Sequence, residues 1–215
     1  MSDKKSPQSA VVQASVSKPA PSGKILVFTA PSGAGKTTLV RHLLGKFPDK
    51  IAFSVSATTR APRVHETHGA DYYFLSQADF QQRIKEARFL EYEEVYEGQY
   101  YGTLRAEIER VWAEGKAVVF DVEVKGASAI KAAYPDAACV VFVSPPNPEV
   151  LFARLRARGT EDETSLKKRI ARAGEELSYR DRFDYVLVND DLEEAKQAAE
   201  DLALYWLGYD SNLHR

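Results

Sequence analysis

Residues 30–37 read Ala-Pro-Ser-Gly-Ala-Gly-Lys-Thr, a glycine-rich segment that ends in a lysine and a hydroxyl residue. The segment matches the phosphate-loop pattern G-x-x-x-x-G-K-[ST], except that Ala30 replaces the first glycine. In such a loop the backbone N–H groups converge on phosphate oxygens, and the helix that follows adds a favourable dipole. We expect Lys36 to reach the β- and γ-phosphates of a nucleotide and the Thr37 hydroxyl to bind Mg²⁺. The alternative is a strand–helix turn that contains Gly-Lys-Thr without binding phosphate.

Two carboxylates lie at the end of an apolar run over residues 117–122. Asp121 is placed where the carboxyl end of a parallel strand faces the ligand crevice, so it is expected to act on Mg²⁺ directly or through water. Glu123 lies two residues further on, and in an extended chain both carboxylates therefore point to the same side. The alternative is a strand-end turn or a helix cap.

Arginines form two groups that could bind phosphate. Arg60 and Arg63 flank Pro62, which stiffens their segment, and guanidinium groups suit bidentate contacts to phosphate. In the second group, Arg154 and Arg158 share one helical face at i, i+4, where like charges destabilise a helix unless an anion neutralises them. A solvated, charged helix face is the alternative for these two. Further basic residues follow at Arg156, Lys167, Lys168, Arg169 and Arg172.

No Ser-His-Asp set and no H-E-x-x-H pattern is evident, and the four histidines are scattered. If the acceptor is itself a phosphate, it is already ionised near neutral pH and needs no general base. Catalysis would then rest on positioning and on neutralising charge, which suits phosphoryl transfer between two nucleotides.

The elements that would hold these residues follow an α/β pattern. Apolar runs without alternation are typical of a parallel sheet covered on both faces, and helical stretches lie between them. Strands are predicted at 25–29, 117–122, 139–143 and 185–188, and helices at 37–47, 104–114, 125–133, 148–158, 165–179 and 191–207. Asn147 supplies a helix N-cap before Pro148. Residues 68–103, rich in Tyr, Phe and Glu, predict a small, partly antiparallel lobe inserted into this body.

Composition restricts the class of protein. The chain has 215 residues, 44% of them hydrophobic, and a formal net charge of −2, which argues against a dedicated nucleic-acid or membrane-surface binder. The single cysteine excludes an intramolecular disulfide framework and a Cys-rich zinc site. Cys139 lies in an apolar run, which favours a buried strand thiol over a reactive nucleophile. No run approaches the ~18–20 apolar residues of a membrane span.

Residues 1–22 are rich in Ser, Pro, Ala, Gln and Lys and contain no aromatic residue. Such a segment cannot bury enough surface to offset its ordering entropy, so we expect a disordered N-terminal tail. A transit peptide is a weaker alternative, because the segment has Asp3 and no arginine. The lack of an apolar signal segment favours a cytoplasmic location.

A series of short motifs, taken in order, closely resembles guanylate kinase over about residues 24–207. The motifs are the phosphate loop and residues 56–63, 69–74, 89–92, 100–103, 158–160 and 188–191. The resemblance implies an α/β fold of the P-loop kinase type, in which a parallel sheet flanked by helices carries an inserted GMP-binding lobe and a helical lid. It implies a domain over 23–207, with core 23–55, 106–145 and 183–207, lobe 56–105, lid 146–182, and a C-terminal tail at 208–215.

The implied reaction transfers the γ-phosphoryl group of ATP, with Mg²⁺, to GMP and also to dGMP, giving ADP and the diphosphate. The resemblance implies catalytic roles for Lys36, Arg60, Arg154, Arg158 and Arg169, and a metal site at Thr37 and Asp121. The ATP-binding residues would be Ala30, Pro31, Ser32, Gly33, Ala34, Gly35, Lys36, Thr37 and Thr38, with Asn189 near the adenine. The GMP phosphate would be held by Arg60, Arg63, Tyr72 and Tyr101. The guanine side would be formed by Ser56, Glu91, Thr103, Asp121 and Glu123.

The choice of guanine has a chemical reason. Guanine presents N1–H and N2–H₂ donors, and a carboxylate such as Glu91 can accept both, whereas AMP would leave that buried carboxylate unpaired. Without the resemblance, Glu91 would be one of many acids on a strand and Tyr72 and Tyr101 would be lobe core. Glu123 stands where the family more often has Asp.

Two other functions stay open at this point. One is a non-catalytic guanylate-kinase-like module that binds protein partners, and the other is a kinase for another nucleoside monophosphate. Intact Lys36, Thr37 and lid arginines favour an active kinase. Its expected partners are small nucleotides, with no nucleic-acid polymer and no membrane, and the oligomeric state is not predicted.

Overall fold

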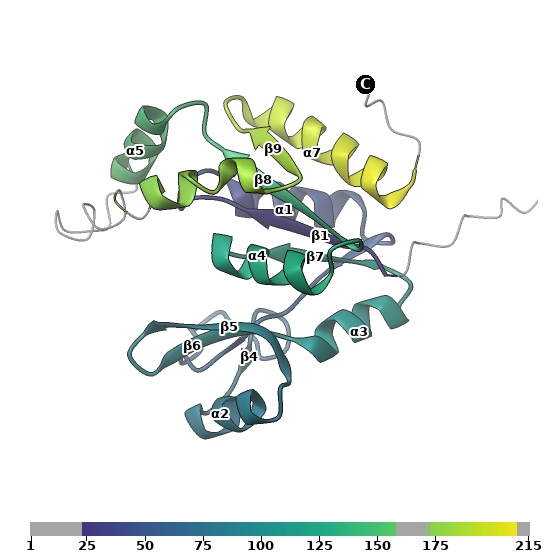
Figure 1. Cartoon of the computed structure of the whole chain (residues 1–215), viewed down its shortest axis with the longest axis vertical. Coiled ribbons are helices and arrows are strands. Elements are labelled where there is room, and N and C mark those ends of the chain that lie inside the picture. The colour runs from purple at the N-terminus through teal and green to yellow at the C-terminus, as the bar shows by residue number, and fades with distance from the viewer. Residues whose placement is uncertain (1–22, 158–170, 172, 210–215) are drawn as a thin grey trace, which may run out of the picture.

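The computed structural model describes residues 23–157, 171 and 173–209, and its body is a five-stranded parallel sheet (Figure 1). The strand order is β2-β7-β1-β8-β9, and every pair of neighbours is parallel. The strands are β1 (Ile25–Thr29), β2 (Ile51–Phe53), β7 (Ala117–Asp121), β8 (Ala138–Ser144) and β9 (Tyr185–Val188). Because β1 lies at the centre, the loop that follows it opens at the carboxyl edge between β7 and β8.

Helices cover both faces of this sheet, as the unalternated apolar strands predict. Along β1, Leu26 and Phe28 belong to one buried cluster while Ile25 and Val27 belong to the other. The first cluster includes residues of α1 (Lys36–Lys46), α5 (Pro148–Ala157) and α7 (Leu192–Leu207). The second includes residues of α3 (Arg105–Ala113) and α4 (Val124–Ala133).

A second, four-stranded sheet forms the inserted lobe, in the order β4-β3-β6-β5. Its strands are β3 (Ala57–Thr58), β4 (Tyr73–Phe74), β5 (Phe89–Tyr96) and β6 (Gln99–Leu104), and α2 (Gln77–Lys85) packs on it. Phe80 of α2 stacks on Phe89 with ring centroids 4.3 Å apart, which gives the lobe a core of its own. The lobe lies beyond α4, on the side away from α1 and α7, and β5 contacts α4 (Figure 1).

Glu107, in the first turn of α3, ties the lobe to the body. Its carboxylate accepts hydrogen bonds from Val55 N (3.0 Å), from Tyr73 Oη (2.7 Å), and from Arg110 Nε and Nη2 (both 3.0 Å). Val55 is in the segment that enters the lobe, Tyr73 is inside the lobe, and α3 follows the strand that leaves it. One buried carboxylate therefore joins both crossings of the chain.

Most predicted elements are confirmed within one or two residues, including the Asn147 cap, whose Oδ1 accepts from Val150 N at 2.9 Å. The predicted helix over 165–179 lies partly outside the described residues; within it, residues 171 and 173–177 are helical. Among the described residues, β2, α2 and a short 3₁₀ helix at Arg180–Arg182 were not predicted. The prediction that helices cover both faces of every strand is wrong for β9. This strand lies at the edge of the sheet, and Tyr185, Val186 and Val188 are 36%, 37% and 47% exposed. Cys139 is buried, as expected. Across the described residues, none of the helices combines the length and the apolar surface that crossing a bilayer requires.

Candidate active site

The phosphate loop, residues 30–37, connects β1 to α1 at the carboxyl edge of the sheet. Gly33 and Gly35 have φ values of 93° and 97°, in the left-handed region that favours glycine. This backbone shape turns successive N–H groups toward one concave side, which is an anion-binding arrangement. The first turn of α1 contains no acidic residue, so its positive dipole end is not neutralised from within the helix.

Lys36 and Thr37 both converge on Asp121, which ends the neighbouring strand β7. Lys36 Nζ forms an ion pair with Asp121 Oδ1 and donates to Val122 O at 2.9 Å. Thr37 Oγ1 donates to Asp121 Oδ2 at 2.7 Å. The predicted phosphate-binding and metal-binding side chains therefore lie together at one point of the sheet edge.

A magnesium ion fits the donors at this point. Mg²⁺ prefers hard oxygen ligands and in nucleotide sites takes one or two protein groups besides phosphate oxygens and water. Thr37 Oγ1 and the Asp121 carboxylate are donors of this kind and adjoin one another. Within the described part of the chain no three His, Cys, Asp or Glu side chains gather as a metal site, so an all-protein cage is not present there.

Arg60 is held in one orientation by Glu66. Its Nη1 and Nη2 donate to the two carboxylate oxygens at 2.9 and 2.8 Å, and Arg63 N donates to Glu66 Oε2 at 2.7 Å. The hydrogen bonds from Arg60 and from the Arg63 backbone lower the pKa of Glu66 to about 2. The same ion pair raises the pKa of Arg60. Glu66 was not identified from the sequence as a partner of Arg60. The one signal for this contact is its position three residues after Arg63, in a turn.

Two tyrosines surround the Arg60 guanidinium. It lies 5.4 Å from the centroid of Tyr72, and Tyr72 meets Tyr101 edge-on with ring centroids 6.0 Å apart. Burial raises the pKa of Tyr72, so its hydroxyl stays a hydrogen-bond donor at neutral pH. The structure thus brings together Arg60, Tyr72 and Tyr101, while the Arg63 side chain is exposed beside them.

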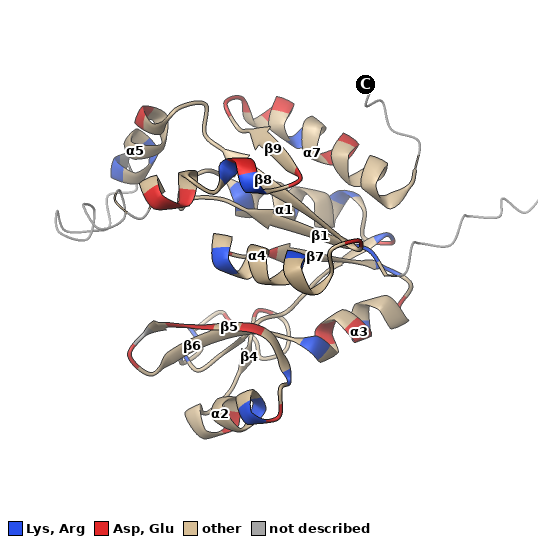
Figure 2. Ribbon diagram, viewed as in Figure 1, with Lys and Arg blue, Asp and Glu red and all other residues tan. Residues whose placement is uncertain are grey.

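Glu91 and Thr103 face each other across the β5–β6 pair. Thr103 Oγ1 donates to Glu91 Oε1 at 2.6 Å, and Thr103 is fully buried. Burial raises the pKa of Glu91, and the bond from Thr103 offsets part of that rise. A Cβ built on Gly126 would lie 3.4 Å from Glu91 Oε2, so this oxygen faces the first turn of α4. Acidic residues run along β5 (Figure 2), and among them Glu91 is the one whose carboxylate accepts a hydrogen bond from the buried Thr103.

Two other predicted guanine-side residues lie at the entry to the lobe and at the start of α4. Ser56 stands where the chain enters the lobe, and its carbonyl accepts from Tyr73 N at 2.9 Å. Glu123 is the residue before α4 and is exposed. A cavity of about 490 Å³ lies between β5, the start of α4 and the helical residues after 170. It is lined by Glu93, Glu123, Val124, Lys125, Ala171, Glu175, Glu176 and Tyr179.

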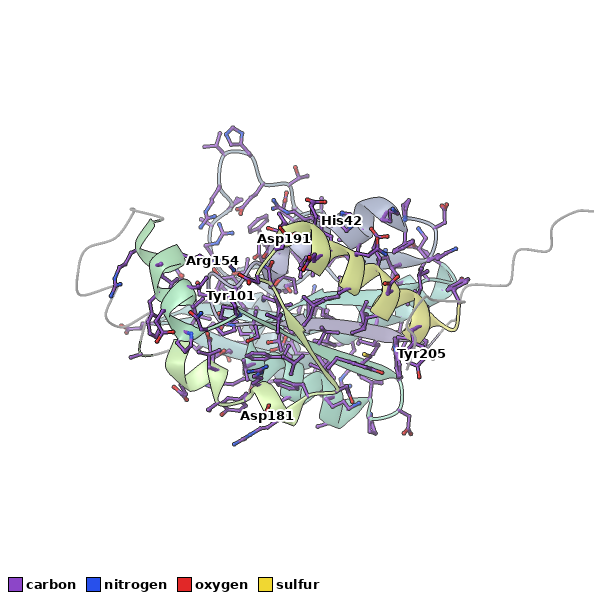
Figure 3. All side chains as sticks on the ribbon, turned by 90° about the horizontal axis from the view of Figure 1, so that it is seen from above. His42, Tyr101, Arg154, Asp181, Asp191 and Tyr205 are labelled. Carbon is purple, nitrogen blue, oxygen red and sulfur yellow. The ribbon has the colours of Figure 1, made fainter. Side chains whose placement is uncertain are left out.

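Arg154 and Asn189 meet behind the phosphate loop. Arg154 Nη1 donates to Asn189 O at 3.1 Å, and Asn189 Nδ2 donates to Ala34 O at 2.7 Å. Figure 3 shows Arg154 on the side of the molecule away from Tyr205, with Asp191 between them in this view. The side-chain amide of Asn189, expected near adenine, thus contacts the loop itself. Arg158 and Arg169 lie outside the described residues.

Comparisons with known proteins find a matching family, similar sequences and a similar crystal structure. A model of the guanylate kinase family matches residues 22–203. A guanylate kinase of Bacteroides fragilis is 47% identical over 188 residues, which cover 87% of this chain and 92% of the relative. One from Salinibacter ruber is 51% identical over 175 residues, covering 81% and 92%. The crystal structure of guanylate kinase from Anaplasma phagocytophilum has a TM-score of 0.65 and 28% identity, covering 87% of this chain and 88% of that one.

Proposed function

The chain belongs to the guanylate kinase family, and we propose that it transfers the γ-phosphoryl group of ATP to GMP, and also to dGMP, between its phosphate loop and its inserted lobe. The products are ADP and GDP, or dGDP. The observation that carries the guanine assignment is the half-buried Glu91 carboxylate, bonded to the buried Thr103 and turned toward α4. Neither a protein-binding module nor a kinase for another nucleoside monophosphate is favoured by these relatives.

The donor nucleotide binds at the phosphate loop, residues 30–38. The backbone N–H groups of the loop hold its phosphates, and Lys36 moves from Asp121 to the β- and γ-phosphate oxygens. This movement of the Lys36 side chain is short, because the Lys36–Asp121 ion pair already lies beside the phosphate loop. Thr37 and Asp121 would hold Mg²⁺, which would neutralise phosphate charge.

The acceptor phosphate binds to Arg60, Arg63, Tyr72 and Tyr101. Glu66 accepts from Nη1 and Nη2 of Arg60, and Ala61 O accepts from Nη1 at 2.7 Å, so the phosphate would bind at the guanidinium edge formed by Nε and Nη2. The acceptor phosphate is ionised near neutral pH, so the protein has no proton to remove. Its task is to align two anions and neutralise their charge.

Glu91 selects the base. As a carboxylate it accepts the N1–H and N2–H donors of guanine, while Thr103 and Ser56 complete the base site and Glu123 borders it. Adenine has no N1–H to donate, so Glu91 would keep only the bond from Thr103 and its other oxygen would lose its ligand partner, which costs about 1–3 kcal/mol. The lid, residues 146–182, would bring Arg154, Arg158 and Arg169 to the transferred phosphoryl group, with the body at 23–55, 106–145 and 183–207 as its support.

The experiment is a coupled assay of ADP release with Mg-ATP and GMP, on the wild type and on Lys36→Ala. We expect GMP-dependent turnover in the wild type and a loss on the order of 10²–10³ in kcat for Lys36→Ala. Lys46→Ala is the matched control, because Lys46 ends the same helix but is half-exposed beside Glu200. Unchanged turnover in Lys36→Ala would contradict the proposed role of the loop.

A cytoplasmic location fits a chain whose single cysteine is a buried thiol.

A further inference from the structure

The side chain of Asn189 reaches the phosphate loop from the far end of the chain. Asn189 follows β9, and its Nδ2 donates to Ala34 O at 2.7 Å across 155 positions of sequence. Both residues are buried, with Asn189 5% exposed and Ala34 0% exposed. A hydrogen bond of this kind is shielded from water, so losing its donor leaves a buried carbonyl unsatisfied.

The Ala34 carbonyl requires a side-chain donor because it precedes the first carbonyl that accepts a backbone hydrogen bond of α1. The backbone hydrogen bonds of α1 start one residue later, at Gly35 O, which accepts from Thr38 N (3.1 Å) and Leu39 N (3.3 Å). Ala34 lies between two glycines in the left-handed region, a backbone that presents its N–H groups to an anion. A loop that turns its N–H groups inward turns carbonyls outward, and buried carbonyls require donors.

Asn189 is itself fixed from two sides. Its backbone N–H donates to Ser144 O of β8 at 2.8 Å, and its carbonyl accepts from Arg154 Nη1 at 3.1 Å. The helix α5 also packs directly against the phosphate loop, since a Cβ built on Gly33 would lie 3.2 Å from Leu155 Cδ2. The loop, Asn189 and the arginine-bearing face of α5 therefore form one packed unit.

We propose that Asn189 is a positioning residue that holds the phosphate loop in its anion-binding shape and links it to Arg154, rather than a residue that reads the adenine base. The proposal rests on the proposed function, because it assigns the loop to the phosphates of ATP. It also gives Gly35 a second constraint besides its φ of 97°, since a Cβ there would collide with the amide nitrogen of Asn189.

The test compares a ligand with a base and a ligand without one. Asn189→Asp keeps the size of the side chain but replaces the donor by an oxygen facing the Ala34 carbonyl. We expect its KM for ATP and its inhibition constant for inorganic tripolyphosphate to rise together, by about tenfold or more, with the KM for GMP changed less than twofold. Asn147→Asp is the matched control, because Asn147 acts as an acceptor and the aspartate can still cap α5.

Asn189→Ala provides a second variant in case Asn189→Asp does not fold, and it adds a coupling test. Gly35→Ala should cost less in KM for ATP when Asn189→Ala is also present, because the collision with the amide is removed. A rise for ATP with unchanged tripolyphosphate inhibition would overturn the proposal in favour of a base contact. Unchanged constants, or an equal loss for ATP and GMP with a lowered Tm, would also overturn it. Absence of GMP turnover in the wild type would instead contradict the proposed function.

Discussion

Glu91 Oε1 accepts a hydrogen bond from Thr103 Oγ1 at 2.6 Å, across two strands of the inserted lobe. The bond fixes one carboxylate oxygen and leaves the other beside Gly126, at the first turn of α4. The proposed base site is therefore built from a lobe side chain that lies against the body of the protein.

Glu91→Gln should raise the KM for GMP by about 10- to 100-fold, because hydrogen bonds to a charged group contribute about 1.5–3 kcal/mol. The KM for ATP should change less than twofold, since the donor binds elsewhere. Glu94→Gln on the same strand is the control, because Glu94 is exposed and accepts from Gly98 N in the β5–β6 turn, and it should leave both constants nearly unchanged. An equal loss in Glu94→Gln would contradict a specific role for Glu91.

The KM for GMP should also fall as pH rises through the ionisation of Glu91. The carboxylate accepts guanine donors only when ionised, and burial raises its pKa, so the titration should lie above the ordinary value of about 4.3. Glu91→Gln removes this titration but keeps that of the GMP phosphate. Identical pH profiles for the two proteins would contradict the assignment.

Glu66→Gln should raise the KM for GMP about fivefold or more, because Arg60 loses the charged partner that orients it. Glu86→Gln is the control, since Glu86 bonds Gln82 and Arg88 on the surface of α2. Steady-state kinetics with GMP varied would check both. A lower KM in Glu66→Gln would show that Glu66 competes with the ligand instead of positioning Arg60.

Elements with a strong pattern could be predicted from the sequence, and the limits have physical causes. The unalternated apolar run of β1 and the capped stretch of α7 are visible in the chain itself. β2 has only three residues and is stabilised by pairing with β7, which no local pattern reveals. α2 has a capping signal in Ser76 and Asp79, but it lies in a region dominated by aromatic residues and glutamates.

The residues of the candidate site also fall into a group that local sequence features predict and a group that they do not. The phosphate loop and its partner Asp121 follow from a motif and a strand end, both local features. The contacts of Asn189 with Ala34 and of Glu107 with Val55 and Tyr73 join segments far apart in sequence. Such pairings depend on the folded topology, so residue type and spacing do not reveal them.

Glu107→Gln should lower the free energy of unfolding by about 1.5–3 kcal/mol at pH 7, because the buried carboxylate loses the charge that strengthens its hydrogen bonds from Val55 N, Tyr73 and the exposed Arg110. Burial raises the pKa of Glu107, but the bonds from Arg110, Tyr73 and Val55 N outweigh it and lower the pKa overall. A lowered pKa in the folded state means that this stability is present above about pH 4.3 and is lost as pH falls through the folded pKa.

Urea unfolding from pH 7 to pH 3 would therefore show the wild type and Glu107→Gln converging in acid. Glu114→Gln is the matched control, because Glu114 binds the same arginine at the surface and should cost less than about 1 kcal/mol. A difference between wild type and Glu107→Gln that does not depend on pH would contradict the ionic role of Glu107.

Cys139 should react at least 100-fold more slowly with a thiol reagent at pH 8 in the folded protein than in denaturant. It is 1% exposed, and burial raises its pKa to about 12, so the thiolate that attacks the reagent is scarce. As the chain has one cysteine, the absorbance of the released leaving group reports this site alone. Rapid reaction of the folded protein would contradict the buried position of β8.

We propose that the half-buried Glu91 carboxylate, bonded to Thr103, makes the chain a kinase for GMP. The decisive measurement is kcat/KM with Mg-ATP for GMP, dGMP, AMP, CMP and UMP, on the wild type and Glu91→Gln. We expect the wild type to favour GMP over AMP by about 10⁴, as for sites that hydrogen-bond a specific donor, and Glu91→Gln to lose much of that preference. A wild type that turns over AMP or UMP as well as GMP would contradict the account.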